Sequence, residues 1–203
     1  MIAWSIQAAH DSGCFEHIIV STDDDEIAKV AEDHGAQTPF RRAPDLADDH
    51  TPTISVIADA IRQLKLNDQT SVCCLYATAP FVLPEYLTEG YWLLEETQAL
   101  FVMSITTFPF PIQRALRRKK SGAVEMFDPE KMNMRSQDLE ESFHDAGQFY
   151  WATAATWKGE KGMFKCGTFG LHLPRHRVQD IDTDEDWCHA EWMMQALKSE
   201  IIE

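Results

Sequence analysis

Residues 71–107 read SVCCLYATAPFVLPEYLTEGYWLLEETQALFVMSITT, and this stretch decides the fold class. It begins with a continuous apolar run over 71–76 and ends with a second run over 101–107. Short apolar runs without polar alternation are typical of strands that are covered on both faces. Pro84 opens a helix between them, because proline favours the first turn of a helix. A strand, a helix and a second buried strand in this order predict an α/β layered fold with a mainly parallel sheet.

The segments before this unit continue the alternation. Apolar residues at helical spacing predict a helix over 2–12, and a β-branched run over 18–20 predicts a short buried strand. Thr22 is expected to cap a second helix that ends near residue 34. A further helix is expected over 53–66. The first third of the chain therefore fits the same α/β pattern.

The segments after this unit change character. Residues 114–127 read as two strands around a turn at Lys119–Gly122, which predicts an antiparallel hairpin inserted into the fold. We assign residues 108–147 to this inserted region. The last element is a long helix that begins like a capping box, with Thr183 followed three residues later by Asp186. Because no repeat or linker interrupts the chain, residues 1–203 are expected to form one domain.

The composition describes a folded, acidic protein. Of 203 residues, 44% are hydrophobic, and 33 acidic against 18 basic residues give a formal charge of -15. Such a surface repels nucleic-acid phosphates and anionic lipid, so we expect neither nucleic acid nor membrane as a partner. The five cysteines include no C-x-x-C pair and fit reduced core thiols. Without a signal peptide or a membrane-spanning run, a cytoplasmic location is expected.

One absence concerns the start of the chain. Parallel nucleotide-binding sheets normally begin with a strand that leads into a glycine-rich turn at a helix N-terminus. This chain begins inside a helix, and its nine glycines form neither G-x-G-x-x-G nor a P-loop. We therefore expect a first strand and loop to lie upstream of Met1.

Asp180-Ile181-Asp182 is the first candidate site. Residues two apart on an extended segment point the same way, about 6 to 7 Å apart. Two such carboxylates can hold one Mg²⁺ while phosphate oxygens and waters complete its octahedron. The alternative interpretation is that Asp182 caps the last helix and Asp180 is solvated. The pattern is short, so its spacing leaves both interpretations open.

Four further segments place polar side chains in loops or at strand ends. Arg42 follows an expected strand, where a guanidinium suits phosphate or carboxylate, although pairing with nearby aspartates is the plainer interpretation. Residues 134–139 and 144–151 combine cations, amides and aromatics, as sugar and base sites do, and a folded loop explains them equally. Thr78 lies where a buried strand ends and the chain turns at Pro80, and a plain turn accounts for it as well.

Taken together, several segments resemble the acylneuraminate cytidylyltransferases, which make CMP-activated nine-carbon sugar acids. The resemblance extends from about Ile2 to Leu197 and is strongest to the branch that acts on pseudaminic acid. The segments that carry it are 19–23 (IVSTD), 42–47 (RAPDLA), 76–81 (YATAPF), 107–114 (TFPFPIQR), 134–139 (MRSQDL), 144–151 (HDAGQFYW) and 178–183 (VQDIDT). They are specific together, and none of them is specific alone.

The resemblance implies a Rossmann-like three-layer nucleotide-sugar transferase fold and a homodimer whose inserted hairpin region reaches towards the partner. It implies that Asp180 and Asp182 are the catalytic carboxylates that bind Mg²⁺. For substrate binding, it implies Arg42 and Thr53 on the nucleotide side and Arg135, Gln137 and Tyr150 on the sugar-acid side. To these we add Thr78 at the strand end.

The implied reaction is attack of the anomeric hydroxyl of the sugar on the α-phosphorus of CTP, which displaces pyrophosphate and leaves a CMP-sugar. Such a transfer depends on positioning and charge neutralisation, so Mg²⁺ would screen the phosphates and Arg135 would suit the substrate carboxylate. In sialic acid members the strand-end motif begins Gln-Pro-Thr-Ser-Pro, and its Gln contacts the base. Tyr76-Ala-Thr-Ala-Pro stands here instead, which favours pseudaminic acid and a product used in surface glycan or flagellin glycosylation.

Two alternatives stay open. The family begins with a strand and a loop rich in Arg, Gly, Ser and Lys that grips the CTP triphosphate, and this chain begins just beyond them. One alternative is therefore a non-catalytic, truncated cytidylyltransferase-like domain. The other is a sister enzyme that acts on another sugar acid, such as sialic acid or Kdo, or a D-x-D glycosyltransferase.

Overall fold

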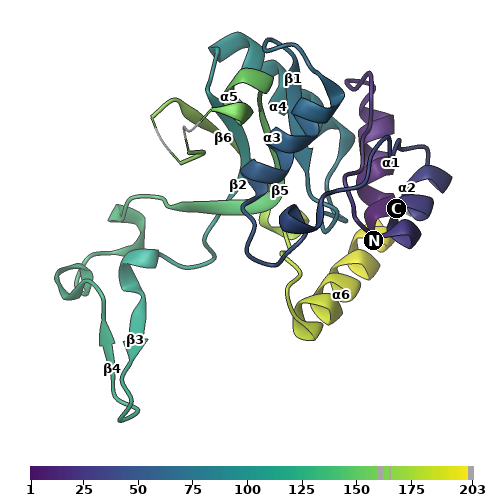
Figure 1. Ribbon diagram of the computed structural model, residues 1–203. Coiled ribbons are helices and arrows are strands. Elements are labelled where there is room, and N and C mark those ends of the chain that lie inside the picture. Colours follow the sequence, from purple (N-terminus) through teal and green to yellow (C-terminus); the bar gives the residue numbers. More distant parts are fainter. Residues whose placement is uncertain (160–161, 165, 201–203) are drawn as a thin grey trace.

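The computed structural model describes residues 1–159, 162–164 and 166–200 (Figure 1). The helices are α1 (Ile2–Ser12), α2 (Asp25–Asp33), α3 (Thr53–Leu64), α4 (Pro84–Thr97), α5 (Ala154–Lys158) and α6 (Asp184–Glu200). The strands are β1 (Ser71–Leu75), β2 (Phe101–Thr107), β3 (Leu116–Arg118), β4 (Val124–Met126), β5 (Phe143–Thr153) and β6 (Thr168–His172). Short 3₁₀ helices lie at Pro44–Leu46, Ile112–Arg114, Pro129–Lys131, Ser136–Asp138 and Arg175–Arg177.

The central sheet has the strand order β1–β5–β2–β6. β2 and β6 pair in parallel, whereas β5 pairs antiparallel with both β1 and β2. β1, β2 and β6 therefore run in one direction, and β5 runs in the other. The expected mainly parallel sheet is confirmed for three of its four strands, and β5 is the strand whose direction the apolar pattern did not reveal.

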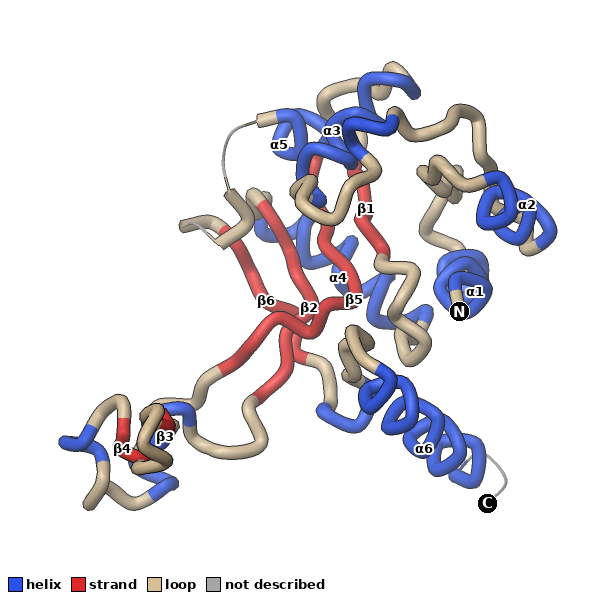
Figure 2. Tube along the Cα trace, turned by 60° about the horizontal axis from the view of Figure 1, so that its bottom comes forward, coloured by secondary structure: helices blue, strands red, loops and turns tan. Residues whose placement is uncertain are grey.

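Helices cover both faces of this sheet, which gives the three layers expected from the sequence (Figures 1 and 2). The alternation of side chains along β5 divides the core, because successive residues of a strand point to opposite faces. Phe149 and Trp151 pack on the side of α1 and α4, and both are at most 1% exposed. Tyr150 and Ala152 pack on the other side, with Ile61 of α3 and Trp157 of α5.

Two local expectations are corrected. The β-branched run around Ile19 forms a single parallel bridge to Gln37 instead of a strand, since in the described chain no ladder continues beside it. The helix α2 is capped by Asp24, whose carboxylate accepts the N–H of Ile27 at 2.8 Å. Thr22 is buried and its hydroxyl accepts the N–H of Asp24 at 3.1 Å, so it supports the cap from one step upstream.

The start of α6 confirms the predicted capping box. The Thr183 hydroxyl accepts the N–H of Asp186 at 3.2 Å, and the Asp186 carboxylate accepts the Thr183 N–H at 2.9 Å and its hydroxyl at 2.7 Å. Asp182 contributes a backbone N–H to Asp186 at 3.3 Å. The interpretation of Asp182 as the helix cap is therefore wrong, because Thr183 and Asp186 supply the capping side chains.

The inserted hairpin forms an arm that stands away from the body (Figures 1 and 2). As predicted, β3 and β4 pair antiparallel around the Lys119–Gly122 turn. The Glu125 carboxylate bonds Arg117 at 2.6 Å and also pairs with Lys119. Large apolar side chains are exposed on this region: Phe110, Ile112, Leu116, Val124, Phe127 and Met132. Among the described helices, none combines the length and apolar character that a membrane span requires.

Candidate functional site

β1, β2 and β6 all end at one edge of the sheet, and β5 begins there. We call this region the strand-end edge; it consists of the turn 76–80, residues 143–150 of β5 and the segment 177–182 before α6. Ligands of open α/β sheets bind beyond the carboxyl ends of the strands. The strand-end edge is therefore the place where the predicted site residues should meet.

Asp180 lies against β5 at Gly147. A Cβ on Gly147 would lie 3.6 to 3.8 Å from the Asp180 carboxylate, so the glycine leaves a space that any side chain would fill. Gly147 has a φ of 63°, in the left-handed region that favours glycine. The neighbouring Gln148 is buried, and its amide donates to the carbonyl of Arg177. Both contacts fix the segment that carries Asp180 onto β5.

Other carboxylates surround Asp180. Partial burial and then the charge of Asp182 raise the pKa of Asp180 above its ordinary value, against one backbone hydrogen bond that lowers it. Asp145 and Asp186 repel the Asp180 charge more weakly. A gathering of like charges with a raised pKa is the electrostatic setting in which a bound cation is favoured.

A chain of polar contacts crosses the edge from β5 to α3. Asp145 accepts the Gly147 N–H at 2.9 Å and the Tyr150 hydroxyl at 2.6 Å. The rings of Tyr150 and Tyr76 are 5.4 Å apart, and the Tyr76 hydroxyl is 3.3 Å from Oγ1 of Thr53, the first residue of α3. Burial, and then the hydrogen bond to Asp145, raise the pKa of the Tyr150 phenol far above its usual range. The hydroxyl of Tyr150 therefore stays protonated.

Arg42 holds the loop before α3 to the segment after α1. Its Nε donates to the Ser21 hydroxyl at 3.2 Å, its guanidinium also bonds the Ser21 carbonyl, and its N–H donates to the carbonyl of Thr22 at 2.9 Å. The aspartate-paired arginine of this loop is Arg41, whose Nε is 2.8 Å from the Asp25 carboxylate. The structure therefore contradicts the alternative in which Arg42 pairs with a nearby aspartate.

The remaining predicted residues divide between the strand-end edge and the inserted region 108–147, which we call the arm region. Thr78 lies half-buried in the turn after β1, at the strand-end edge. Arg135 forms an exposed ion pair with Asp138, with N–O distances of 2.8 and 3.1 Å. Gln137 lies exposed in the same 3₁₀ turn. The structure thus links Thr53 and Tyr150 near Asp180, whereas Arg135 and Gln137 stay in the arm region.

Sequence reasoning gave no site role to Asp145 and Gly147. Both residues lie within 144–151, a segment predicted to contribute to the site as a whole. The local signal was an Asp two residues before a Gly inside a strand, which is typical of a side chain that bonds its own backbone at a bulge.

The described residues contain no group of three or more His, Cys, Asp or Glu side chains placed to hold a metal ion. Asp180 and Asp182 therefore stand as a pair. A pair is the usual protein share of a Mg²⁺ site, because Mg²⁺ keeps several waters and binds substrate phosphates.

Comparison with known proteins decides the family. Residues 1–157 match the family model described as Cytidylyltransferase. The chain belongs to the cytidylyltransferase family. Pseudaminic acid cytidylyltransferase of Campylobacter jejuni is 40% identical over 188 residues, which cover 92% of this chain and 81% of that protein. N-acylneuraminate cytidylyltransferase of Oncorhynchus mykiss is 32% identical over 195 residues, which cover 94% of this chain and 43% of that protein.

Solved structures agree on the fold of this cytidylyltransferase. CMP:2-keto-3-deoxy-manno-octonic acid synthetase complexed with CTP has a TM-score of 0.64 at 11% identity, covering 98% of this chain and 88% of that one. 4-Diphosphocytidyl-2C-methyl-D-erythritol synthase of Anaerococcus prevotii has a TM-score of 0.63 at 13% identity, covering 96% and 85%. At these identities the likeness carries the fold alone. The predicted nucleotide-sugar transferase fold is confirmed.

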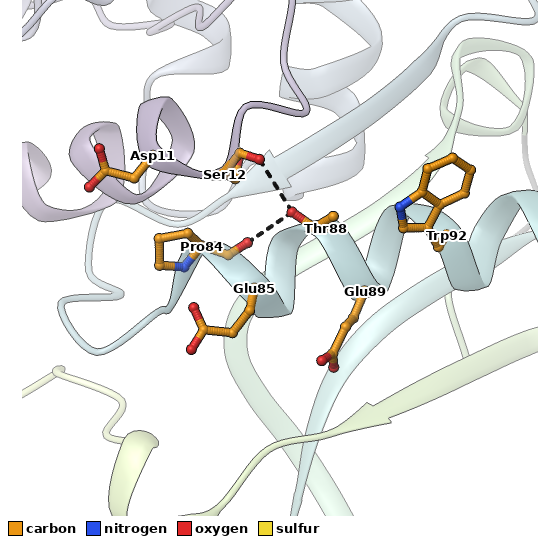
Figure 3. A pocket seen from close by; sticks show the side chains of 7 residues that line it. All are labelled: Asp11, Ser12, Pro84, Glu85, Thr88, Glu89 and Trp92. Atoms are coloured by element: carbon orange, nitrogen blue, oxygen red, sulfur yellow. Dashed lines mark hydrogen bonds between the residues drawn. The ribbon is translucent and has the colours of Figure 1, made fainter.

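A hollow of about 370 Å³ lies elsewhere on the cytidylyltransferase, between α1 and α4 (Figure 3). It is lined by Asp11, Ser12, Pro84, Glu85, Thr88, Glu89 and Trp92. The Thr88 hydroxyl bonds the carbonyls of Pro84 at 3.2 Å and Ser12 at 3.4 Å across its floor. Its lining includes no predicted site residue, and its acidic side chains do not suit a nucleotide triphosphate. The strand-end edge remains the candidate active site.

Proposed function

We propose that this cytidylyltransferase transfers CMP from CTP to pseudaminic acid, giving CMP-pseudaminic acid and pyrophosphate for surface glycan or flagellin glycosylation. The observation that carries the proposal is the 40% identity to pseudaminic acid cytidylyltransferase over 92% of this chain. The strand-end motif Tyr76-Ala-Thr-Ala-Pro supports the same sugar acid. Sialic acid and Kdo are less favoured, because the sialic acid relative reported above is 32% identical and the Kdo enzyme 11%.

In the proposed reaction, the anomeric hydroxyl oxygen forms a bond to the α-phosphorus and its proton passes to water. The bond from the α-phosphorus to the oxygen that bridges to the β-phosphate breaks, and pyrophosphate leaves. The strand-end edge would orient the two substrates. Thr53 and Arg42 are proposed on the nucleotide side, together with Thr78 in the turn after β1. Tyr150 is proposed on the sugar-acid side, where its protonated hydroxyl is held by Asp145.

The residues at Asp180 fit Mg²⁺. Asp180 lies among like charges, and Gly147 places no side chain against its carboxylate. We propose that Asp180 and Asp182 hold the ion. When bound, Mg²⁺ would screen the phosphates of CTP and stabilise the charge that develops during transfer.

Arg135 and Gln137 are proposed to bind the sugar acid from the arm region. Arg135 now pairs with Asp138, in an exposed ion pair that costs little to open. A guanidinium can bind a substrate carboxylate through two parallel hydrogen bonds.

We also propose a homodimer in which a partner covers the exposed apolar side chains of the arm, and sedimentation at several concentrations tests it.

The free cysteines support a cytoplasmic location. Cys14, Cys73, Cys74, Cys166 and Cys188 are all unbonded to one another. Free thiols persist in reducing compartments, whereas secreted proteins tend to pair them. We therefore propose that the reaction takes place in the cytoplasm.

The test is Mg²⁺-dependent pyrophosphate release from CTP, with pseudaminic acid, N-acetylneuraminic acid and Kdo compared as acceptors. Each is run on the 203-residue chain and on a version extended upstream by a family-type strand and loop. We expect release with pseudaminic acid at a kcat/KM well above that of the other two. Release with another acid would reassign the substrate, and release with none of them from either version favours the non-catalytic alternative.

Asp182→Asn tests the carboxylate assignment in the same assay. Because Asp182 does not cap α6, we expect turnover to fall by roughly 10²-fold or more, with a melting temperature close to that of the wild type. The control is Asp68→Asn, an identical change in the loop before β1, at the far end of the sheet. A near-normal rate for Asp182→Asn would overturn the metal assignment.

A further inference from the structure

Asp145 joins two parts of the strand-end edge that are otherwise separate. It lies half-buried on β5, beside the shift in register between Met103 and Ile105 of β2. One carboxylate oxygen accepts the Gly147 N–H at 2.9 Å, and the other accepts the Tyr150 hydroxyl at 2.6 Å. Both oxygens are thus engaged within five residues of the same strand, at the point where the strand is irregular.

The bond to Gly147 determines the surface on which Asp180 lies. Asp side chains stabilise turns by accepting the N–H two residues on, and they tolerate a left-handed residue there. Gly147 is that residue, and the Asp180 carboxylate lies 3.6 to 3.8 Å from the position that a Cβ would occupy. If the carboxylate at position 145 were lost, the turn at Gly147 would lose its restraint. The position of Asp180 would then loosen with it.

The bond to Tyr150 determines which way the phenol points. A tyrosine hydroxyl has one proton to donate, and here it goes to Asp145. The lone pairs of the oxygen are therefore left for donors on the Tyr76 side and from a substrate. Without this bond, the hydroxyl would be free to rotate, and a sugar hydroxyl or amide would have to order it on binding.

We propose that Asp145 is a positioning residue for the transfer reaction, which sets Asp180 for metal binding through Gly147 and sets the hydroxyl of Tyr150 for the sugar acid. The inference rests on the proposed function for its substrate, but the effect on metal binding can be measured without any substrate. Two carboxylates bind a cation well only when their orientation is restrained by neighbours. Asp145 supplies that restraint from the strand beneath.

The first measurement is a titration of the full chain with Mn²⁺ in the absence of substrates, and electron paramagnetic resonance detects the bound ion. Asp145→Asn keeps the size of the side chain, but it leaves one neutral acceptor oxygen for two donors, so the bond to Gly147 is weakened or lost together with the charge. We expect Mn²⁺ to bind roughly tenfold more weakly than to the wild type. Asp68→Asn, with the same loss of one charge, should bind as the wild type does. Equal affinity in the two variants, or no binding by the wild type, overturns the proposal.

The second measurement separates positioning from a general loss of structure. Tyr150→Phe keeps the Asp145 charge and its bond to Gly147, so Mn²⁺ affinity should stay within about threefold of the wild type. Its KM for pseudaminic acid should rise roughly tenfold, while kcat changes less. Asp145→Asn should lower kcat as well. A variant that is merely destabilised would show a lower apparent kcat with an unchanged KM. If Asp145→Asn and Tyr150→Phe weaken Mn²⁺ binding equally, the role of Gly147 is overturned.

A third variant covers the case in which Asp145→Asn does not fold. Gly147→Ala leaves Asp145 intact but places a methyl group against Asp180 at a φ of 63°. It should also weaken Mn²⁺ binding by roughly tenfold. Unchanged binding would overturn the proposal. If the wild type transfers CMP to no sugar acid, the proposed function fails, while the Mn²⁺ comparison still decides the link from Asp145 to Asp180.

Discussion

Gly90→Ala should destabilise the protein, although alanine is the better helix former. Gly90 lies in α4 and faces the sheet, where it is buried. A Cβ at this position would lie 2.9 Å from Cε2 of Phe149 and 2.9 Å from Cδ1 of Trp151. Non-bonded carbons pack at about 3.5 to 4.0 Å, so both contacts are short by at least about 0.6 Å.

Neither ring has room to move away. Phe149 is 0% exposed and Trp151 is 1% exposed. Trp151 is stacked on Phe15 at a centroid distance of 5.1 Å, and Tyr91 lies against it at 5.5 Å. Alanine gains about 1 kcal/mol of helix propensity over glycine, and overpacking a rigid core costs about 1 to 3 kcal/mol. Because the rings are held from several sides, we expect a net loss of about 1 to 2 kcal/mol.

Urea and thermal unfolding measure this loss. For a chain of this size, a loss of about 1 kcal/mol lowers the melting temperature by about 2 to 4 °C. The control is Glu89→Ala, an exposed position in the same helix, which should stay within about 0.5 kcal/mol of the wild type. If Gly90→Ala were as stable as the wild type or more stable, the packing of α4 on β5 would be looser than the structure has it.

Two further predictions concern the start of α6 and the buried thiol of Cys74. Thr183→Ala removes the hydroxyl that accepts the Asp186 N–H, so urea unfolding should show a loss of about 0.5 to 2 kcal/mol, which Thr183→Ser should largely restore. Burial raises the pKa of the Cys74 thiol to about 12, so the folded state keeps a proton that the unfolded chain releases at lower pH. The stability from this group is complete below about pH 8.5 and is lost as pH rises towards 12, so Cys74→Ala should show a shallower fall in stability over that window. Identical slopes in urea titrations from pH 8 to 11 would contradict it.

The fold class could be predicted because its signals are local. The apolar runs at 71–76 and 101–107 predict buried strands from their own residues, and the capping box at the start of α6 is set by residues three apart. The run around Ile19 was predicted as a strand and is not one, because a strand also needs a partner along its length. Direction was out of reach for β5, since nothing in its own residues records which neighbours it meets.

Some residues of the candidate site could be proposed from local patterns in the sequence, and others could not. Asp180 and Asp182 stand out because two carboxylates at strand spacing form a pattern on their own. The proposed role of Asp145 depends on the irregularity of β5 at Gly147 and on the contact of Gly147 with Asp180, 33 residues later, and spacing in the sequence predicts neither. Arg135 was predicted to bind a carboxylate from its residue type, but its ion pair with Asp138 becomes visible only in the folded loop.

The reversed direction of β5 is what assembles the site. In a parallel strand the last residues reach the strand-end edge, and in β5 it is the first half of the strand that lies there. Tyr150, which is bonded to Asp145, therefore lies beside Tyr76 at the carboxyl end of β1, and Asp180 lies against the intervening Gly147. Were β5 parallel to its neighbours, these side chains would lie at the opposite edge, away from the start of α3. The strand that departs from the predicted direction is thus the one that brings Asp180, proposed to bind metal, close to Tyr150, proposed to bind the sugar acid.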